Sequence, residues 1–407
     1  MKQKKVILAI IIAAIVVAVI GIGICIWLIA VEAENKKLDA EALTLKENLK
    51  VEFAQEVKVS DFIQELKGKL LEDPVIATEN LGEVQVPVHF ENIKNRKRKL
   101  AFTIQVVDTT PPQIFSGSTY TVTVGYTKNL TDVLLSGDNA DNTPKREILG
   151  DYDVSTVGNY PLTYVVTDAS GNQTKKEFTL RVKEKTTSTT TTATQTPKLQ
   201  FAEVKEMHKT EQTKVGIDVS KWQGEINWQE VKEAGVEFAM IRLGYQTDYD
   251  GTYEIDPYFE ANIKGAKEAG LPVGGYFYSY AKNVGQAKEQ AQWVTEKLKG
   301  YSLELPVAYD WESWTSFNKA GMSFHTLNQC ANVFLRTIEE AGYQGMLYSS
   351  KNYLETMWHK SNYPVWLAQY NTHVTYGGDY SIWQMSDKGR VNGIKGDVDL
   401  DILYLKK

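Results

Sequence analysis

The stretch LPVAYDWES, residues 305–313, decides the fold of the C-terminal half of the chain. Its apolar run predicts a short buried strand, Val307–Asp310, which Glu312 follows almost at once. Residues two apart in a strand point to the same face, so the carboxylates of Asp310 and Glu312 should lie side by side, with Cα atoms about 6.6 Å apart. Acidic groups in an apolar strand are costly unless they are paired or functional, which indicates a site at this strand end.

The same pattern of short apolar strands separated by helical stretches continues from Lys214 to the end of the chain. Eight strands are predicted: Val215–Val219, Phe238–Leu243, Val273–Tyr278, Val307–Asp310, Met346–Ser349, Val365–Gln369, Ser381–Gln384 and Val398–Leu403. Helices are predicted after the first five strands: Trp228–Ala234, Tyr258–Ala269, Val284–Leu298, Thr326–Ala341 and Asn352–Met357. Residues 214–407 therefore predict an α/β barrel of five βα units and three further β-strands, with function at the C-terminal strand ends.

Two more of these strands carry carboxylates. Asp218 lies near the end of the first predicted strand and Asp399 lies in the last one. A structural pair is the alternative for any single residue, but three converging strands favour a site. Two carboxylates as close as Asp310 and Glu312 cannot ionise independently, so one pKa rises and the pair supplies an acid and a base. Glycoside hydrolysis uses such a pair, and further carboxylates would stabilise its cationic transition state.

Aromatic residues gather at or near the predicted strand ends. They are Trp222, Tyr245, Tyr276, Tyr278, Trp311, Tyr348, Trp366, Tyr370 and Trp383. An apolar ring with a polar tip suits stacking on a pyranose ring and hydrogen bonding to its hydroxyl groups. Core packing is the alternative, and we expect about half of these residues to serve it.

Together these residues resemble glycoside hydrolase family 25, the Chalaropsis-type lysozymes. The motifs that carry the resemblance are GIDVSKWQG (216–224), a strand with Arg242, GGYFYSY (274–280), YDWES (309–313), the strand at Tyr348, PVWLAQY (364–370), IWQMS (382–386) and DVDLD (397–401). Their order and the strand count make the resemblance specific, and it covers the last domain, just under half of the chain.

The resemblance implies an N-acetylmuramidase, which cleaves the β-1,4 bond between N-acetylmuramic acid and N-acetylglucosamine in peptidoglycan. It implies Glu312 as the general acid, with Asp310, Asp218 and Asp399 as its carboxylate partners. Asp310 would either assist attack by the sugar's N-acetyl group or support a water molecule. Asp401 departs from the asparagine of many relatives, and we expect it to be tolerated. The predicted substrate-binding residues are Tyr278, Tyr276, Tyr348, Trp366, Gln384, Arg242 and Trp222.

The N-terminal segment Val6–Ala30 contains 25 residues without a charge. As a helix it would be about 37 Å long, enough to cross a hydrocarbon core of about 30 Å. Lysines in residues 1–5 precede it, so the positive-inside rule predicts a cytoplasmic tail and an extracellular remainder. A cleaved signal peptide is the alternative, but its apolar core would be shorter and would end in a clearer cleavage site.

Residues 48–184 contain a repeat with an offset of 76, seen where Leu81–Phe90 aligns with Val157–Val166. Both copies alternate apolar and polar residues, which predicts two all-β sandwiches, residues 48–108 and 109–184, similar to the immunoglobulin-like modules of bacterial surface proteins. Residues 31–47 would form a stalk and the threonine-rich residues 185–213 a linker.

The basic run Lys94–Lys99 is interpreted as a solvated hairpin tip, with contact to anionic wall polymers as the alternative.

The overall composition excludes several classes of function. A net charge of −6 argues against a nucleic-acid-binding protein. Two cysteines and five scattered histidines show no metal-ligand spacing, so we expect neither a metal nor a cofactor. We therefore expect a single-pass membrane protein that remodels peptidoglycan outside a Gram-positive type of membrane. The alternative is an inactive wall-binding or structural protein; the oligomeric state is not determined by the sequence.

Overall fold

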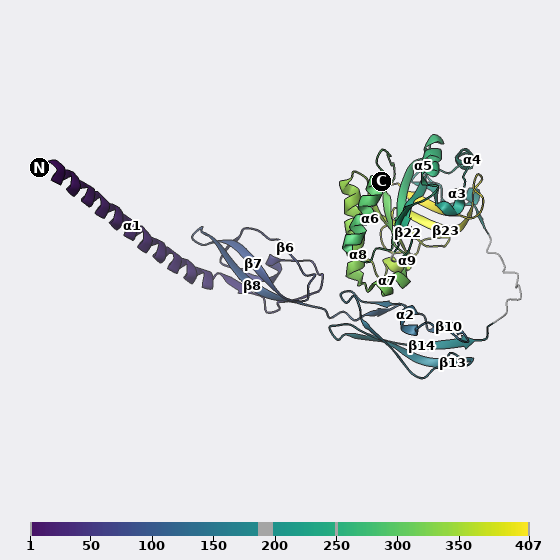
Figure 1. Ribbon diagram of the computed structural model, residues 1–407, viewed down its shortest axis with the longest axis horizontal. Helices are drawn as coiled ribbons and strands as arrows, with labels where there is room; N and C mark the ends of the chain where they lie inside the picture. Colours follow the sequence, from purple (N-terminus) through teal and green to yellow (C-terminus); the bar gives the residue numbers. More distant parts are fainter. Residues whose placement is uncertain (1, 186–197, 249–250, 406–407) are drawn as a thin grey trace. The chain divides into compact units, whose positions relative to one another are not determined.

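The structure, a computed structural model, describes residues 2–185, 198–248 and 251–405 (Figure 1). It divides the chain into two compact units, residues 1–109 and 110–407, which we describe separately. Residues 186–197 of the predicted threonine-rich linker lie outside the described residues.

The first unit begins with one long helix, α1 (Lys2–Ala40). This helix contains the uncharged run, and among the described residues it alone is long and apolar enough to span a membrane. The helix continues for ten residues past Ala30, through much of the predicted stalk. Its apolar side chains are exposed along residues 12–29, so no protein core accounts for them.

A β module follows α1 in the first unit. Its main sheet has four strands in the order β2-β8-β7-β5: β2 (Lys50–Glu52), β8 (Lys97–Val107), β7 (Gly82–Asn92) and β5 (Gly68–Leu70). Two small antiparallel pairs complete it: β1 (Leu43–Leu45) with β4 (Ile63–Leu66), and β3 (Val57–Lys58) with β6 (Val75–Ile76). Alternate residues such as Val86, Val88 and Phe90 are buried, as the period of two predicts.

The second unit begins with a module of the same topology. Its main sheet runs in the order β10-β14-β13-β12: β10 (Thr119–Thr123), β14 (Gln173–Lys183), β13 (Gly158–Thr167) and β12 (Lys145–Leu149). A short helix and one small sheet complete it: α2 (Leu130–Val133), and β9 (Gln113–Ile114) with β11 (Ser136–Gly137). β13 and β14 begin 76 residues after β7 and β8 (158 against 82, 173 against 97), so the predicted repeat and its offset are confirmed.

The rest of the second unit is a closed barrel, and all eight predicted strands are present in it. They are β16 (Thr213–Val219), β17 (Ala239–Gln246), β19 (Val273–Tyr278), β20 (Val307–Asp310), β21 (Gly345–Ser350), β22 (Val365–Ala368), β23 (Ile382–Arg390) and β24 (Val398–Tyr404). Neighbours from β16 to β23 pair in parallel, whereas β24 pairs antiparallel with both β23 and β16 and closes the ring.

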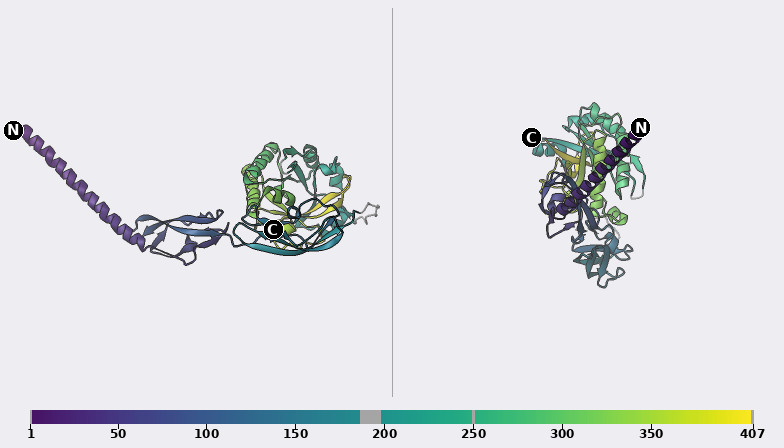
Figure 2. Two further views of the ribbon diagram at one scale, coloured as in Figure 1. Left: turned by 60° about the horizontal axis from the view of Figure 1, so that its bottom comes forward. Right: turned by 90° about the vertical axis from the view of Figure 1, so that its left-hand side faces the viewer.

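Helices surround this ring of strands (Figures 1 and 2). The five predicted ones are α4 (Trp228–Glu233), α5 (Phe259–Glu268), α6 (Val284–Lys297), α8 (Phe324–Glu340) and α9 (Lys351–Leu354). Within residues 214–405, the sequence analysis did not predict the short elements η2 (Lys221–Gln223), β18 (Tyr253–Ile255) and α7 (Trp314–Ala320). The large core packs the outside of the strands against the helices, and a smaller apolar cluster that includes Tyr276, Tyr348 and Trp366 fills the barrel interior.

One predicted boundary is wrong. Residues 199–213 were assigned to the linker, but β15 (Leu199–Gln200) pairs with β23 and α3 (Phe201–His208) packs on the barrel. Phe201 and Val204 are fully buried in the large core. Because of these contacts, the barrel domain begins before residue 214. The sequence pattern did not indicate this, because four of the eight residues of this short helix are polar.

Candidate active site

Five carboxyl groups meet at one end of the barrel. Asp218 is near the end of β16, Asp310 is the last residue of β20, and Glu312 follows two residues later. Because β24 runs antiparallel to β16, its beginning meets the end of β16, so that Asp399 is the registered partner of Asp218 and Asp401 the partner of Gly216. Acidic residues from three strands therefore converge as the sequence predicts. Asp401 lies two residues further along β24 than Asp399 and is fully buried.

Asp310 and Glu312 contact each other through their carboxyl groups. Asp310 is only 3% exposed, whereas Glu312 is exposed and lines an open pocket of about 360 Å³. Desolvation raises the pKa of both groups, and the neighbouring carboxyl of Glu312 raises that of Asp310 further. The bond between the two carboxyl groups raises the pKa of Asp310 and lowers that of Glu312, so Asp310 holds the proton they share. Desolvation still leaves the pKa of Glu312 above its ordinary value, and a proton that Glu312 retains can reach the pocket.

Gln384 on β23 connects the carboxyl groups to two tyrosines. Its Nε2 donates hydrogen bonds to Asp218 Oδ2 (2.8 Å) and Asp399 Oδ2 (3.2 Å). Its Oε1 accepts hydrogen bonds from the hydroxyl groups of Tyr348 (2.9 Å) and Tyr370 (3.2 Å). The amide thus uses two donors and two acceptor sites, and the opposite amide orientation would place its oxygen against two carboxyl groups. Gln384, predicted to bind substrate, is placed by these contacts among the residues that position the site.

Asp401 is fully buried behind Asp218. Its Oδ1 accepts a hydrogen bond of 2.8 Å from the indole nitrogen of Trp366, and its carboxyl group contacts that of Asp218. Two carboxyl groups can be hydrogen-bonded only if one carries a proton. Desolvation raises the pKa of Asp401 to about 8 and that of Asp399 to about 9, and it raises the pKa of Asp218 well above its ordinary value.

The floor of the site is aromatic. Tyr348 and Trp366 pack edge to face with ring centroids 4.7 Å apart, and Tyr276 packs on Trp366 at 5.7 Å. Trp366 is 1% exposed, so the prediction that it binds substrate is wrong for direct stacking, because neighbouring side chains already cover the indole. Trp366 lies in β22, two residues before the pocket residue Ala368, and the sequence of this strand did not indicate that the indole would be buried. Tyr276 and Tyr348 are also buried, at 9% and 7% exposure, but Tyr348 lines the pocket that holds Glu312.

Arg242 is likewise a buried residue of this framework. Its Nε donates to Asp256 Oδ2 at 2.8 Å, inside the protein, and its charge lowers the raised pKa of Asp310. It therefore acts on the site through electrostatics rather than through a surface open to substrate.

Several of the aromatic residues near the strand ends are accessible. Trp222 on η2 is 77% exposed, and Tyr278, which is paired with Asp310 in the sheet, is partly exposed. Tyr370 is 57% exposed and lines the pocket with Glu312. Two of the nine aromatic residues near strand ends, Trp311 and Trp383, belong to the large core instead.

The prediction missed a group of pocket residues that follow the end of β21. Ser350, Asn352 and Tyr353 line the pocket, and the hydroxyl group of Tyr353 donates to the backbone oxygen of Glu312 at 3.3 Å. Their position directly after a barrel strand was the available signal. A larger hollow of about 750 Å³, lined mainly by residues 358–365 and 376–381, contains none of the five carboxyl groups.

Comparisons with known proteins agree with this geometry. Residues 217–394 match the family model of glycosyl hydrolases family 25. YegX of Escherichia coli is 29% identical over 192 residues, covering 46% of this chain and 68% of that protein. Lysozyme M1 of Streptomyces globisporus is 32% identical over 202 residues, covering 45% of this chain and 65% of that lysozyme.

A solved family 25 glycosyl hydrolase from Bacillus anthracis is similar over 49% of this chain and 93% of its own, with 21% identity and a TM-score of 0.42. The family model covers most of the barrel, including Asp218, Asp310 and Glu312, and ends before Asp399 and Asp401. The C-terminal domain of this chain therefore belongs to glycosyl hydrolase family 25 and is a glycoside hydrolase domain.

Proposed function

We propose that the protein is a membrane-anchored muramidase that hydrolyses the β-1,4 bond between N-acetylmuramic acid and N-acetylglucosamine in peptidoglycan. The observation that carries this proposal is the contact between buried Asp310 and exposed Glu312, in a domain of family 25. The similarity of the barrel to lysozyme M1 supports the choice of peptidoglycan as substrate.

Glu312 acts as the general acid in this proposal. Its raised pKa keeps a proton available, and its exposure in the pocket lets that proton reach the glycosidic oxygen. As the proton transfers, the bond between this oxygen and the sugar's anomeric carbon breaks, and the bonding electron pair stays with the oxygen. Positive charge then develops on the sugar ring, where the surrounding carboxyl groups stabilise it.

Asp310 does not act as the nucleophile opposite Glu312 in this mechanism. Two carboxyl groups on opposite sides of a glycosidic bond are separated by about 5 Å or more, whereas those of Asp310 and Glu312 are in contact. The attacking group is then the sugar's own N-acetyl oxygen or a water molecule, and Asp310 orients it while tuning the proton affinity of Glu312. The stereochemistry of the first product, measured by NMR, separates these two routes because N-acetyl participation retains the anomeric configuration and direct attack by water inverts it.

The N-terminal half positions the barrel in this proposal. The uncharged part of α1 would anchor the chain with its N-terminus in the cytoplasm, and two immunoglobulin-like β modules would hold the barrel outside the membrane. Such an enzyme would remodel the wall locally in an envelope of the Gram-positive type. Membrane fractionation followed by protease treatment of intact protoplasts tests this topology, and a protected barrel would contradict it.

Full-length protein with Glu312→Gln tests the activity. The amide cannot donate a proton as an acid does, so release of reducing ends from purified walls should fall by roughly 10²- to 10⁴-fold. Binding to walls should persist, and mass spectrometry of the wild-type products should show cleavage after N-acetylmuramic acid. Wild-type protein that binds walls without releasing sugar ends would refute the enzyme and favour the non-catalytic alternative.

A further inference from the structure

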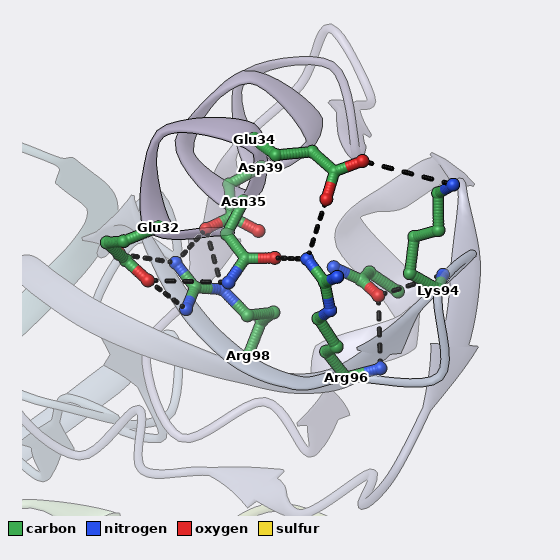
Figure 3. Close-up of polar contacts among 8 residues, drawn as sticks. Glu32, Glu34, Asn35, Asp39, Lys94, Arg96 and Arg98 are labelled. Atoms are coloured by element: carbon green, nitrogen blue, oxygen red, sulfur yellow. Dashed lines mark hydrogen bonds and ion pairs between the residues drawn. The ribbon is translucent and has the colours of Figure 1, made fainter. Parts of the chain in front are cut away.

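The basic run that the sequence places on a hairpin tip is partly paired with α1. The run spans the turn between β7 and β8 and the first three residues of β8, but its arginines are not simply solvated. Arg98 donates to both oxygens of Glu32, at 3.1 Å each, and to Asp39 Oδ2 at 2.6 Å. Arg96 donates to Glu34 Oε2 at 2.9 Å and to Asn35 Oδ1 at 2.8 Å. Figure 3 shows these groups facing one another across the helix and the hairpin.

The contact joins the module to the end of α1 through several bonds at once. Glu32, Asn35 and Asp39 are three and four residues apart, so they share one face of the helix. Asp39 and Arg98 are mostly buried, with side chains 11% and 20% exposed. The bidentate pairing with Arg98 lowers the pKa of Glu32, which favours the charged form of Glu32. Because two parallel hydrogen bonds also restrict the geometry, this arginine–carboxylate contact fixes the orientation of the hairpin relative to α1.

The hairpin tip, defined here as residues 93–99, consequently lies just beyond the uncharged run. Glu34 is four residues past Ala30, or about 6 Å along the helix axis. The polar headgroup layer of a bilayer is about 5–7 Å thick on each side. Lys94 Nζ lies 3.9 Å from Glu34 Oε1, so Lys94 is placed at the level of the headgroups of any membrane that α1 crosses.

The exposed residues of the hairpin tip have the composition of a membrane-surface contact. Ile93 is 62% exposed, and Lys94, Lys97 and Lys99 are exposed as well. Lysines attract anionic headgroups, and an apolar side chain among them can enter the interfacial layer. The arginine pairs neutralise acidic groups of α1 that an anionic surface would otherwise repel.

The second module shows that folding the hairpin does not require these residues. Its equivalent hairpin, β13 and β14, pairs in the same way, and its turn is formed by residues 168–172. At the offset of 76, Ile93 corresponds to Ala169, Lys94 to Ser170 and Arg98 to Thr174. Lys99 corresponds to Lys175, but the apolar residue and the other basic residues of the tip are particular to the copy next to α1, where a membrane would be.

We propose that the hairpin tip of the first β module binds anionic phospholipid headgroups of the membrane that α1 crosses. This inference rests on the anchoring proposed above. Its position beside the helix end favours lipid over an anionic wall polymer, because the contact with α1 places the tip within the headgroup layer rather than in the wall.

The test uses full-length protein in lipid nanodiscs. A polarity-sensitive fluorophore is attached to Ile93→Cys, in a background with Cys25→Ser and the buried Cys330 retained. We expect the label to be shielded from the neutral aqueous quencher acrylamide in phosphatidylglycerol discs and exposed in phosphatidylcholine discs. The same label on Ala169→Cys, the equivalent turn of the second module, should be exposed in both.

A triple change, Lys94→Glu with Lys97→Glu and Lys99→Glu, tests the charge dependence without touching a buried side chain. It should remove the shielding, since each lysine near an anionic surface changes the contact equilibrium by about fivefold. An Ile93 label as accessible as the Ala169 label in phosphatidylglycerol discs would refute the proposal. Shielding by soluble poly(glycerol phosphate), but not by phosphatidylglycerol, would also overturn it in favour of a wall polymer.

Failure of the anchor is distinguished by a separate label. Native Cys25, labelled in protein without Ile93→Cys, should be quenched by lipids that carry a quencher in their acyl chains. If Cys25 is not quenched, the anchoring itself is wrong and the headgroup contact is excluded with it. If Cys25 is quenched while the Ile93 label stays accessible to acrylamide, only the headgroup contact is wrong.

Discussion

The side-chain amide of Gln384 donates a hydrogen bond of 2.8 Å to Asp218, although the two residues are 166 positions apart in the chain. The same amide group binds Asp399 and accepts from two tyrosines, so it sets the spacing of carboxyl groups that would otherwise repel one another.

Gln384→Leu should lower kcat/KM by about 10- to 100-fold. Each lost hydrogen bond to a carboxyl group is worth about 1.5–3 kcal/mol, and a factor of ten corresponds to about 1.4 kcal/mol. Reducing-end release from walls measures the effect. Gln384→Glu serves as the control that keeps the shape but adds a carboxyl group, and it should be at least as damaging. Wild-type rates in both variants would show that the contact does not support catalysis.

Asp401→Asn should retain activity within about threefold of the wild type, whereas Asp401→Leu should not. The bond between the two carboxyl groups raises the pKa of Asp218 and lowers that of Asp401, so Asp218 donates it. The side-chain oxygen of Asn can still accept from Trp366, and its amide nitrogen can donate to Asp218. Leu leaves the buried indole N–H without its acceptor and leaves the Asp218 carboxyl with Gln384 but without Asp401, at about 1–3 kcal/mol for each lost bond. Parallel measurements of wall hydrolysis and melting temperature check this, and equal loss in both variants would mean that the charge of Asp401 is required.

The melting temperature should fall as the pH rises toward 9. Asp401 and Asp399 have folded-state pKa values of about 8 and about 9, above their ordinary value of 3.8. A raised pKa means that the folded state binds the proton more tightly, so this stabilisation is complete below about pH 4 and is lost as the pH passes through 8 to 9. Calorimetry of full-length protein at pH 5, 7 and 9 measures the slope, and Asp401→Asn should reduce it. A wild-type slope that is flat over this range would contradict the raised values.

Hydrolytic activity should decline on the alkaline side through the raised pKa of Glu312. The general acid must carry its proton, and the raised pKa moves the loss of that proton to a higher pH than for an ordinary glutamate. The alkaline limb of kcat/KM against pH reports this group in the free enzyme. Asp310→Asn removes the neighbouring carboxyl and should shift the limb, whereas Trp222→Ala, at an exposed side chain, should leave it in place.

Trp222 and Trp366 should respond in opposite ways to truncation. Trp222 is 77% exposed, so Trp222→Ala should raise KM and leave the melting temperature nearly unchanged. Trp366 is buried, so Trp366→Ala should reduce the free energy of unfolding by about 3–5 kcal/mol. Trp366→Phe keeps most of the volume and isolates the loss of the bond to Asp401. A normal melting temperature for Trp366→Ala would show that the indole is not part of the packed interior.

The sequence by itself determined the local features of this protein. The number and order of the barrel strands, the proximity of Asp310 and Glu312, the uncharged run of α1 and the repeat with an offset of 76 all follow from short-range patterns. Strand and helix periods define which face a side chain occupies, and chain connectivity keeps residues two apart together.

Only the tertiary structure decided which distant groups meet. The antiparallel course of β24 places Asp399 beside Asp218, the crossing of strands buries Trp366, and the fold of the first module brings Arg98 to Glu32 across 66 positions. A residue's face says nothing about which element will cover it, because that depends on long-range pairing and on the desolvation that the assembled neighbours impose. For the same reason, proton retention by the carboxyl groups of the site appears only once the closed barrel surrounds them.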